Sequence, residues 1–238
     1  MPHSAPRIIL GGLLLAALAA PAQAAPARLA PTMFALPSDI IARELAFARA
    51  VRDKGQWPAF RAFATDDAQM FAGDAPVRVQ DFARKQPAPA APLQWETHAV
   101  WMSCDGATAI TYGAWEAGAA HGWFSTIWQR QKKGDYRFIL DQGDATAAAL
   151  PAPEFAEAKV ADCPIRRRGE PPAPAPTPAP NTPPPADHLS GEAPDHTLNW
   201  STTLRPDGGR DYVLRIKLDG KDQEVLRKAV AGKAQSTR

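Results

Sequence analysis

Several side chains between residues 67 and 141 belong to the types that transfer protons in enzymes. They are two carboxylic acids, two imidazoles and one phenol: Asp67, His98, Tyr112, His121 and Asp141. Proton transfer needs a carboxylate or a His held in apolar surroundings, often opposite a Tyr or an acid that stabilises an enolate. The first question is therefore which of these residues share a pocket.

Asp141 is the strongest of these residues as a catalytic candidate because it follows and interrupts the apolar stretch Phe138-Ile139-Leu140. If its carboxylate faces inward, it could act as a general base. The alternative is a structural role in which the carboxylate caps the strand end by accepting hydrogen bonds from backbone amides, and such a role is more common.

The other four candidates also have structural alternatives. His98 and His121 could meet across strands as an acid/base pair or a foothold for a metal, although two such histidines are more often unrelated. Tyr112 could donate a hydrogen bond to a substrate oxygen or could simply be a satisfied, half-buried side chain. Asp67 is expected to end a helix.

Tryptophans are concentrated in the same part of the chain, at Trp95, Trp101, Trp115, Trp123 and Trp128. Aromatic walls suit a flat apolar ligand, and the same surfaces suit a subunit interface or fill a core. Together with Tyr112 and His121, these tryptophans are the predicted ligand-binding residues. A small apolar ligand and a second copy of the chain are the partners they indicate.

Two helices followed by antiparallel strands must position these side chains. Pro37-Ser38 favours a helix start with Ser38 as N-cap, and Gly55 favours its end. Its apolar residues recur on one face, at Ile41, Leu45, Ala48 and Val51. A shorter helix opens at Trp57-Pro58, and a helical turn is expected at 81–85. Strands are predicted at 68–71, 93–103, 108–116, 122–132 and 135–141, mostly joined by hairpin turns.

This order of elements resembles the nuclear transport factor 2-like superfamily, in particular its SnoaL-like bacterial branch. The resemblance covers about residues 38–144. It rests on the segments Glu44-Leu45-Ala46-Phe47-Ala48, 60–71 with its Phe-Ala-Thr-Asp-Asp-Ala core, Trp128-Gln129-Arg130-Gln131 and Gly134-Asp135-Tyr136-Arg137-Phe138.

The resemblance implies an α+β fold in which helices packed on a curved antiparallel sheet enclose a cone-shaped pocket. It places Asp141 near the end where such pockets commonly open, and it implies homodimers that pair through the open face of the sheet. The superfamily contains isomerases, polyketide cyclases, dehydratases and epoxide hydrolases, and also binding and assembly domains. Fold alone therefore assigns no activity.

The first 24 residues have the form of a secretory signal peptide, with Arg7, an apolar run over 8–20 and a cleavage site at Ala22-Gln23-Ala24. An uncleaved membrane anchor is the alternative, although the run is short for a bilayer span. We expect a periplasmic or secreted protein with no stable membrane anchor after cleavage. In such a compartment Cys104 and Cys163 could form a disulfide, or Cys104 could be a buried thiol.

Charge and ligand spacing exclude several classes of partner. The formal net charge of +2 falls to +1 when Arg7 leaves with the signal, which argues against nucleic-acid binding. The histidines are scattered and there is no CxxC motif, so we expect no metal and no cofactor.

Composition divides the chain into six parts. They are a signal peptide at 1–24, a flexible tether at 25–37, the α+β domain at 38–150, a connecting segment at 151–170, a proline-rich linker at 171–187 and a small β-strand module at 188–238. Three strands are predicted in the last part, at 197–204, 211–218 and 222–230. Because three such strands are marginal alone, we expect them to dock on the main domain or on a partner; an independent meander is the alternative.

From these features we predict an exported, non-catalytic domain that binds a small molecule or mediates assembly through an aromatic-lined pocket. The alternative is a small isomerase, dehydratase or cyclase that acts on an apolar carbonyl compound. In that case Asp141 or His98 would be the base and Tyr112 the donor to the developing oxyanion.

Overall fold

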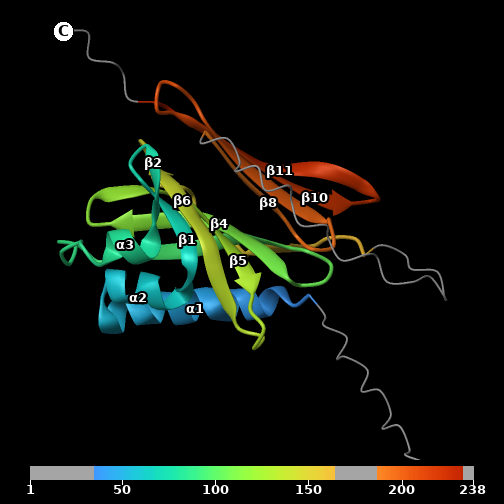
Figure 1. Cartoon of the computed structure of the whole chain (residues 1–238), viewed down its shortest axis with the longest axis horizontal. Coiled ribbons are helices and arrows are strands. Elements are labelled where there is room, and N and C mark those ends of the chain that lie inside the picture. The colour runs from blue at the N-terminus through green and yellow to red at the C-terminus, as the bar shows by residue number, and fades with distance from the viewer. Residues whose placement is uncertain (1–34, 164–186, 233–238) are drawn as a thin grey trace, which may run out of the picture. The chain divides into compact units, whose positions relative to one another are not determined.

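The computed structural model describes residues 35–163 and 187–232 (Figure 1). The predicted signal peptide, nearly all of the tether and the proline-rich linker lie outside the described residues, as do residues 164–170 of the connecting segment. No helix within the described ranges has the length and apolarity needed to cross a bilayer.

Two consecutive helices open the described part of the chain. Helix α1 spans Pro37–Lys54 and α2 spans Gln56–Phe63. Gly55 separates them with a φ of 89°, a backbone conformation that glycine adopts without strain. The N-cap of α1 is Leu36 and no side chain caps it, so the predicted capping role of Ser38 is wrong. A third, short helix, α3, spans Val79–Ala83.

The buried face of α1 differs from the predicted one. Its buried residues are Ile40, Glu44, Phe47 and Val51, whereas Leu45 is 64% exposed. The prediction followed the apolar residues alone. The core instead contains the acidic side chain of Glu44, so the helix is rotated about its axis relative to the prediction.

A seven-stranded sheet follows the helices, with the order β2-β1-β6-β5-β4-β3-β7. Its strands are β1 (Ala64–Ala72), β2 (Ala75–Arg78), β3 (Gln94–Met102), β4 (Thr108–Ala117), β5 (Ala120–Arg130), β6 (Tyr136–Ala145) and β7 (Glu157–Val160). Strands β3 to β6 form the predicted antiparallel meander. Because β1 pairs parallel to β6 and β7 pairs parallel to β3, the sheet is mixed, and the prediction of a purely antiparallel sheet is wrong.

Alternate residues of the central strands enter two different cores, as the pleat of a strand requires. One core joins the helices to the sheet and includes Phe47, Phe60, Trp128 and Phe138. The other core joins the sheet to residues near the C-terminus and includes Ile127, Leu140, Tyr212 and Leu214. Both faces of the central strands are therefore covered by parts of the same chain.

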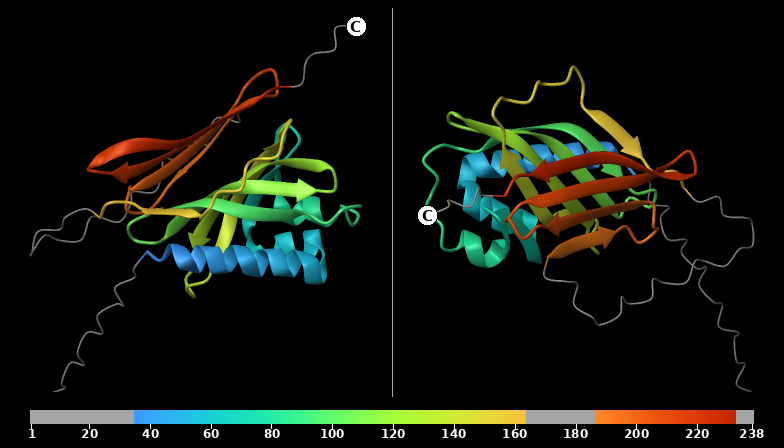
Figure 2. Two further views of the ribbon diagram at one scale, coloured as in Figure 1. Left: turned by 180° about the vertical axis from the view of Figure 1, so that it is seen from behind. Right: turned by 90° about the horizontal axis from the view of Figure 1, so that it is seen from above.

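The C-terminal residues form a separate four-stranded sheet in the order β11-β10-β9-β8 (Figure 2). It contains β8 (His188–Glu192), β9 (Leu198–Leu204), β10 (Arg210–Leu218) and β11 (Lys221–Val230). The last three strands fall at the positions predicted from the sequence. Strand β8 was not predicted, because Leu189 is its single large apolar residue.

A disulfide between Cys104 and Cys163 joins the turn after β3 to the residues after β7. The same corner is bonded to the C-terminal sheet. The Cys104 amide donates to Thr197 Oγ1 over 3.0 Å, and the Asp162 amide donates to the Lys217 carbonyl oxygen over 2.9 Å. The disulfide therefore links two neighbouring parts of the large sheet, and the two hydrogen bonds join this corner to the C-terminal sheet.

Candidate functional site

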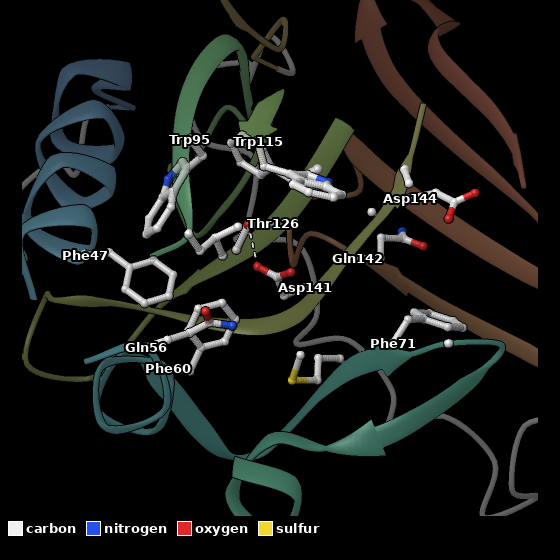
Figure 3. A pocket seen from close by; sticks show the side chains of 16 residues that line it. Phe47, Gln56, Phe60, Phe71, Trp95, Trp115, Thr126, Asp141, Gln142 and Asp144 are labelled. Carbon is white, nitrogen blue, oxygen red and sulfur yellow. Dashed lines mark hydrogen bonds between the residues drawn. The ribbon is translucent and has the colours of Figure 1, made fainter. Parts of the chain in front are cut away.

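A cavity of about 310 Å³ lies between the helices and the large sheet (Figure 3). Six aromatic side chains form much of its wall: Phe47, Phe60, Phe71, Trp95, Trp115 and Phe124. The polar side chains in its lining are Gln56, Thr126, Asp141, Gln142 and Asp144, and among the described residues no Lys, Arg or His lines it. The site is thus an apolar, aromatic chamber with a few polar groups.

Asp141 on β6 lies among these rings, as Figure 3 shows. The register of β5 and β6 places Thr126 directly opposite it, and Thr126 Oγ1 donates to Asp141 Oδ2 over 3.0 Å. This is the one hydrogen bond that the described residues make to the carboxyl group. The rest of the carboxyl group remains available to a bound molecule.

Burial raises the pKa of Asp141 from 3.8 to about 7. The hydrogen bond from Thr126 acts in the opposite direction, and the negative charge of Glu44 raises the pKa further. At neutral pH the carboxyl group therefore exists in both its protonated and its ionised form. A group of this kind in a cavity can take up or release a proton, or can pair with a charge, under physiological conditions.

Glu44 on α1 is a second acidic group behind the cavity wall. It is 4% exposed and accepts three hydrogen bonds, two at Oε1 from Thr111 Oγ1 (2.6 Å) and Trp128 Nε1 (2.9 Å) and one at Oε2 from Trp95 Nε1 (2.8 Å). Burial raises its pKa, and the three hydrogen bonds lower it. These donors compensate the loss of water around a buried carboxylate, so the helix can present Glu44 to the core.

The hydrogen bond to Trp95 links Glu44 to the cavity. Trp95 forms part of the wall, and Glu44 holds its indole in place through the Nε1 hydrogen. Sequence reasoning missed Glu44. The available signal was its spacing, because it stands three or four residues from its apolar neighbours Ile40 and Phe47 on the buried face.

The structure separates the predicted ligand-binding residues into two groups. Trp95 and Trp115 line the cavity, and Trp128 is buried beside it. Trp101 and Trp123 belong instead to the core beneath the C-terminal sheet.

Tyr112 also lies on the face of the large sheet that the C-terminal sheet covers. Its ring centroid is 6.3 Å from that of Trp123, which in turn stacks on Tyr212 of β10 at 6.4 Å. Lys228 Nζ of β11 lies 4.8 Å from the centre of the Tyr112 ring. Tyr112 is therefore part of the contact between the two sheets.

The histidines and Asp67 lie outside the cavity lining as well. His98 is next to Tyr112, with ring centroids 6.5 Å apart, and burial lowers its pKa. His98 lies on β3 and His121 on β5, with β4 between these strands, so the structure does not pair them. Asp67 is exposed within β1 rather than at a helix end. The structure therefore does not bring His98 and Tyr112 together with Asp141.

The C-terminal sheet contacts the strand that carries Asp141. The amide of the next residue, Gln142, donates from Nε2 to Thr202 Oγ1 of β9 over 3.2 Å. Arg210 of β10 donates to the carbonyl oxygen of Gly143, and its guanidinium carbon lies 4.4 Å from the centre of the Phe71 ring. The C-terminal sheet thus contacts residues of both β6 and β1 that form part of the cavity wall.

Metal ligation finds no support among residues 35–163 and 187–232, where no group of three or more His, Cys, Asp or Glu side chains is placed to hold an ion. The cavity itself contributes two carboxyl groups, from Asp141 and Asp144. Its chemistry is accordingly that of aromatic rings, carboxyl groups and amides.

No protein-family model and no curated protein matches the sequence. Solved structures do match. A nuclear transport factor 2-like protein of unknown function from Silicibacter pomeroyi has 15% identity and a TM-score of 0.37, and the match covers 47% of this chain and 99% of that one. A ketosteroid isomerase-like protein from Erwinia carotovora atroseptica has 17% identity and a TM-score of 0.36, over 50% of this chain and all (100%) of the other.

ActVI-ORFA from Streptomyces coelicolor has 10% identity and a TM-score of 0.36, over 47% of this chain and 98% of that one. The protein from Silicibacter pomeroyi is described as nuclear transport factor 2-like, and the one from Erwinia carotovora atroseptica as ketosteroid isomerase-like. Structures of this kind include isomerase-like proteins and proteins of unknown function. The role of this chain therefore has to come from its own cavity.

Proposed function

We propose that this protein binds a small, largely apolar molecule in the aromatic cavity, with a polar group of that molecule placed at Asp141. The observation that carries the proposal is the Asp141 carboxyl group, which is set among six aromatic rings in a cavity of about 310 Å³. Ligand sites typically combine apolar walls, which supply affinity, with a few polar groups, which fix orientation. This cavity has both.

Binding is favoured over an assembly role because the aromatic side chains face inward. The large apolar side chains exposed in the described residues are Leu36, Leu45, Phe155 and Val160, and none of them is a tryptophan. An assembly surface would be expected to display aromatic anchors. Most aromatic residues of the described part instead surround the cavity or fill the two cores, and Phe155 is an exposed exception.

We also propose that the protein works in the periplasm or is secreted. The signal-like residues 1–24 support this location, and so does the Cys104–Cys163 disulfide, because such bonds persist in oxidising compartments.

A proton-transfer enzyme is the second candidate, and the pKa of about 7 for Asp141 favours it. Such an enzyme would isomerise, dehydrate or cyclise an apolar carbonyl compound with Asp141 as acid and base. Since Tyr112 and His98 lie elsewhere and Thr126 donates its hydroxyl hydrogen to Asp141, a hydrogen bond to the substrate oxygen would have to come from an amide of the lining, such as that of Gln56. The described residues of the lining include no His, Lys or Tyr that could act together with Asp141, and we therefore place binding first.

Fluorescence titration with the uncharged probe N-phenyl-1-naphthylamine tests the binding site. We expect saturable enhancement of probe emission with the wild-type chain. Leu93→Trp should abolish it, because Leu93 lines the cavity and the larger ring fills the space. Phe155→Trp is the matched control, because Phe155 is 80% exposed and outside the lining, and it should bind the probe normally. Equal binding by Leu93→Trp and the wild type would show that the probe sits elsewhere.

Native mass spectrometry of the chain purified from its own host supplies the complementary measurement. A retained small-molecule mass that is absent from Leu93→Trp would identify the chemical class of the ligand. Turnover is tested with an uncharged β,γ-unsaturated ketone, whose conjugated product absorbs in the ultraviolet. If Asp141→Asn binds this ketone and loses turnover that the wild type shows, the enzyme reading replaces the binding reading.

A further inference from the structure

The charge balance of the cavity is one-sided. Its lining contains the carboxyl groups of Asp141 and Asp144 and the faces of six aromatic rings, with no basic side chain among the described residues that line it. The face of an aromatic ring carries partial negative charge and attracts cations. The rings and the carboxyl groups therefore favour the same sign of charge in a ligand.

We propose that the cavity selects an organic cation, a small ammonium compound with apolar substituents. Its charge pairs with Asp141, and its substituents lie against Phe47, Phe60 and the other rings of the wall. This inference rests on the proposed function, because it names the class of molecule that the cavity binds. A neutral apolar ligand would leave an ionised Asp141 buried without an opposite charge beside it, which is unfavourable.

The charged groups around Asp141 mostly support a cation. Glu44 contributes a negative charge from α1. Asp144 on β6 also lines the cavity, and its charge interacts with that of Arg210. Arg210 on β10 acts in the opposite sense, but its guanidinium donates to the backbone oxygens of Gly143 and Gly73 and lies over the Phe71 ring. These contacts hold the guanidinium group of Arg210 outside the cavity lining.

The pH dependence of binding separates this proposal from a neutral ligand. A cation needs Asp141 ionised, and the pKa of this group lies at about 7. Binding of a permanently charged cation should therefore strengthen as pH rises through 7. A neutral ligand that accepts a hydrogen bond from protonated Asp141 would show the opposite trend, because the donor disappears as pH rises.

Isothermal titration calorimetry with two probes of matched shape tests the inference. Phenyltrimethylammonium carries a fixed positive charge, and tert-butylbenzene has the same shape without charge. At pH 8 the wild-type chain should bind the cation about tenfold more tightly than the hydrocarbon, and at pH 5.5 this preference should largely vanish. Neither probe titrates in this range, so any pH dependence comes from the protein.

Asp141→Asn should remove the preference for the cation at pH 8, because Asn keeps the size of the side chain but not its charge. Asp67→Asn is the control, because Asp67 is exposed on β1 and outside the cavity, and it should leave both affinities unchanged. Thermal melts followed by circular dichroism establish that both variants are folded.

Equal or tighter binding of tert-butylbenzene at both pH values would overturn the inference and leave the proposed function standing. If neither these probes nor N-phenyl-1-naphthylamine binds, the proposed function fails with it. A cation preference that persists unchanged in Asp141→Asn would also overturn the inference, because another group would then be responsible.

Discussion

Asp141→Asn should change the stability of the protein in a pH-dependent way. Burial raises the pKa of Asp141 from 3.8 to about 7. A carboxyl group with a higher pKa in the folded state binds its proton more tightly there, so ionising it opposes folding. This cost is absent below pH 3.8, grows as pH rises between 3.8 and about 7, and is fully present above that range.

The difference between the two pKa values corresponds to a cost of roughly 4 kcal/mol above pH 7. This is an upper value, because Asp141 retains some accessible surface toward the cavity. Asn has nearly the same volume, cannot ionise and can still accept the hydrogen bond from Thr126. We therefore expect Asp141→Asn to be about as stable as the wild type near pH 4 and up to about 4 kcal/mol more stable at pH 8.

Urea unfolding followed by tryptophan fluorescence, with the disulfide intact, measures this difference at intervals from pH 4 to pH 8. Glu44 also has a pKa raised by burial and contributes to the pH dependence of both proteins, so the comparison of variant with wild type isolates Asp141 and its coupling to Glu44. Asp67→Asn, an exposed acid on β1, serves as the control. A stability difference that is flat across the pH range, or a loss of stability at pH 8, would refute the reasoning.

Three further predictions concern the C-terminal sheet and the corner of the large sheet that it contacts. Arg210→Met should lower the free energy of unfolding by about 2 kcal/mol and weaken binding of N-phenyl-1-naphthylamine, because it removes the hydrogen bond to Gly143. An unchanged urea midpoint and an unchanged affinity for the probe would contradict this prediction. Replacing Cys104 and Cys163 by Ser should cost about 4 kcal/mol in urea unfolding, from release of a link across 59 residues, and a cost near zero would argue against the bond. A chain that ends before His188 should self-associate in sedimentation velocity, because an apolar sheet face loses its cover, and a soluble monomer would count against that role.

The sequence predicted the elements of the fold well because their signals are local. Alternating residues, glycine-containing turns and the helix end at Gly55 depend on near neighbours in the chain. The four strands β3 to β6 accordingly lie close to their predicted positions. The parallel pairings of β1 with β6 and of β7 with β3 were missed, because they join segments far apart in sequence and leave no local pattern.

The orientation of α1 could not be predicted from its own residues. A prediction from the amphipathic pattern excludes Glu from the buried face of the helix. It therefore buries Leu45, whereas the structure buries the neighbouring residue Glu44. The three donors that make Glu44 acceptable are Trp95, Thr111 and Trp128, which lie 51 to 84 residues further along the chain. Only the folded sheet brings them to the helix.

The candidate site was predicted in part for a similar reason. Asp141 was recognised because its carboxylate directly follows and interrupts the apolar stretch Phe138-Ile139-Leu140. Choosing between the two faces of the sheet required more than alternation, because β3 has a register shift between Thr97 and Ala99. Such a shift alters which face successive side chains occupy. Trp95 therefore lines the cavity, whereas Trp101, which strict alternation places on the same face, belongs to the other core.

The resemblance assigned the open face of the sheet to a homodimer, and in this chain the C-terminal sheet covers that face. The C-terminal sheet is also hydrogen-bonded to strand β6 at the two positions that follow Asp141. Gln142 bonds to Thr202 and Gly143 bonds to Arg210, while Asp141 itself faces the cavity. Because residues on one strand cannot move independently, the C-terminal sheet restrains the backbone that aims the carboxyl group. Substitutions at Arg210, which lies outside the cavity lining, should therefore alter ligand affinity, and this effect would distinguish a positioning element from an independent domain.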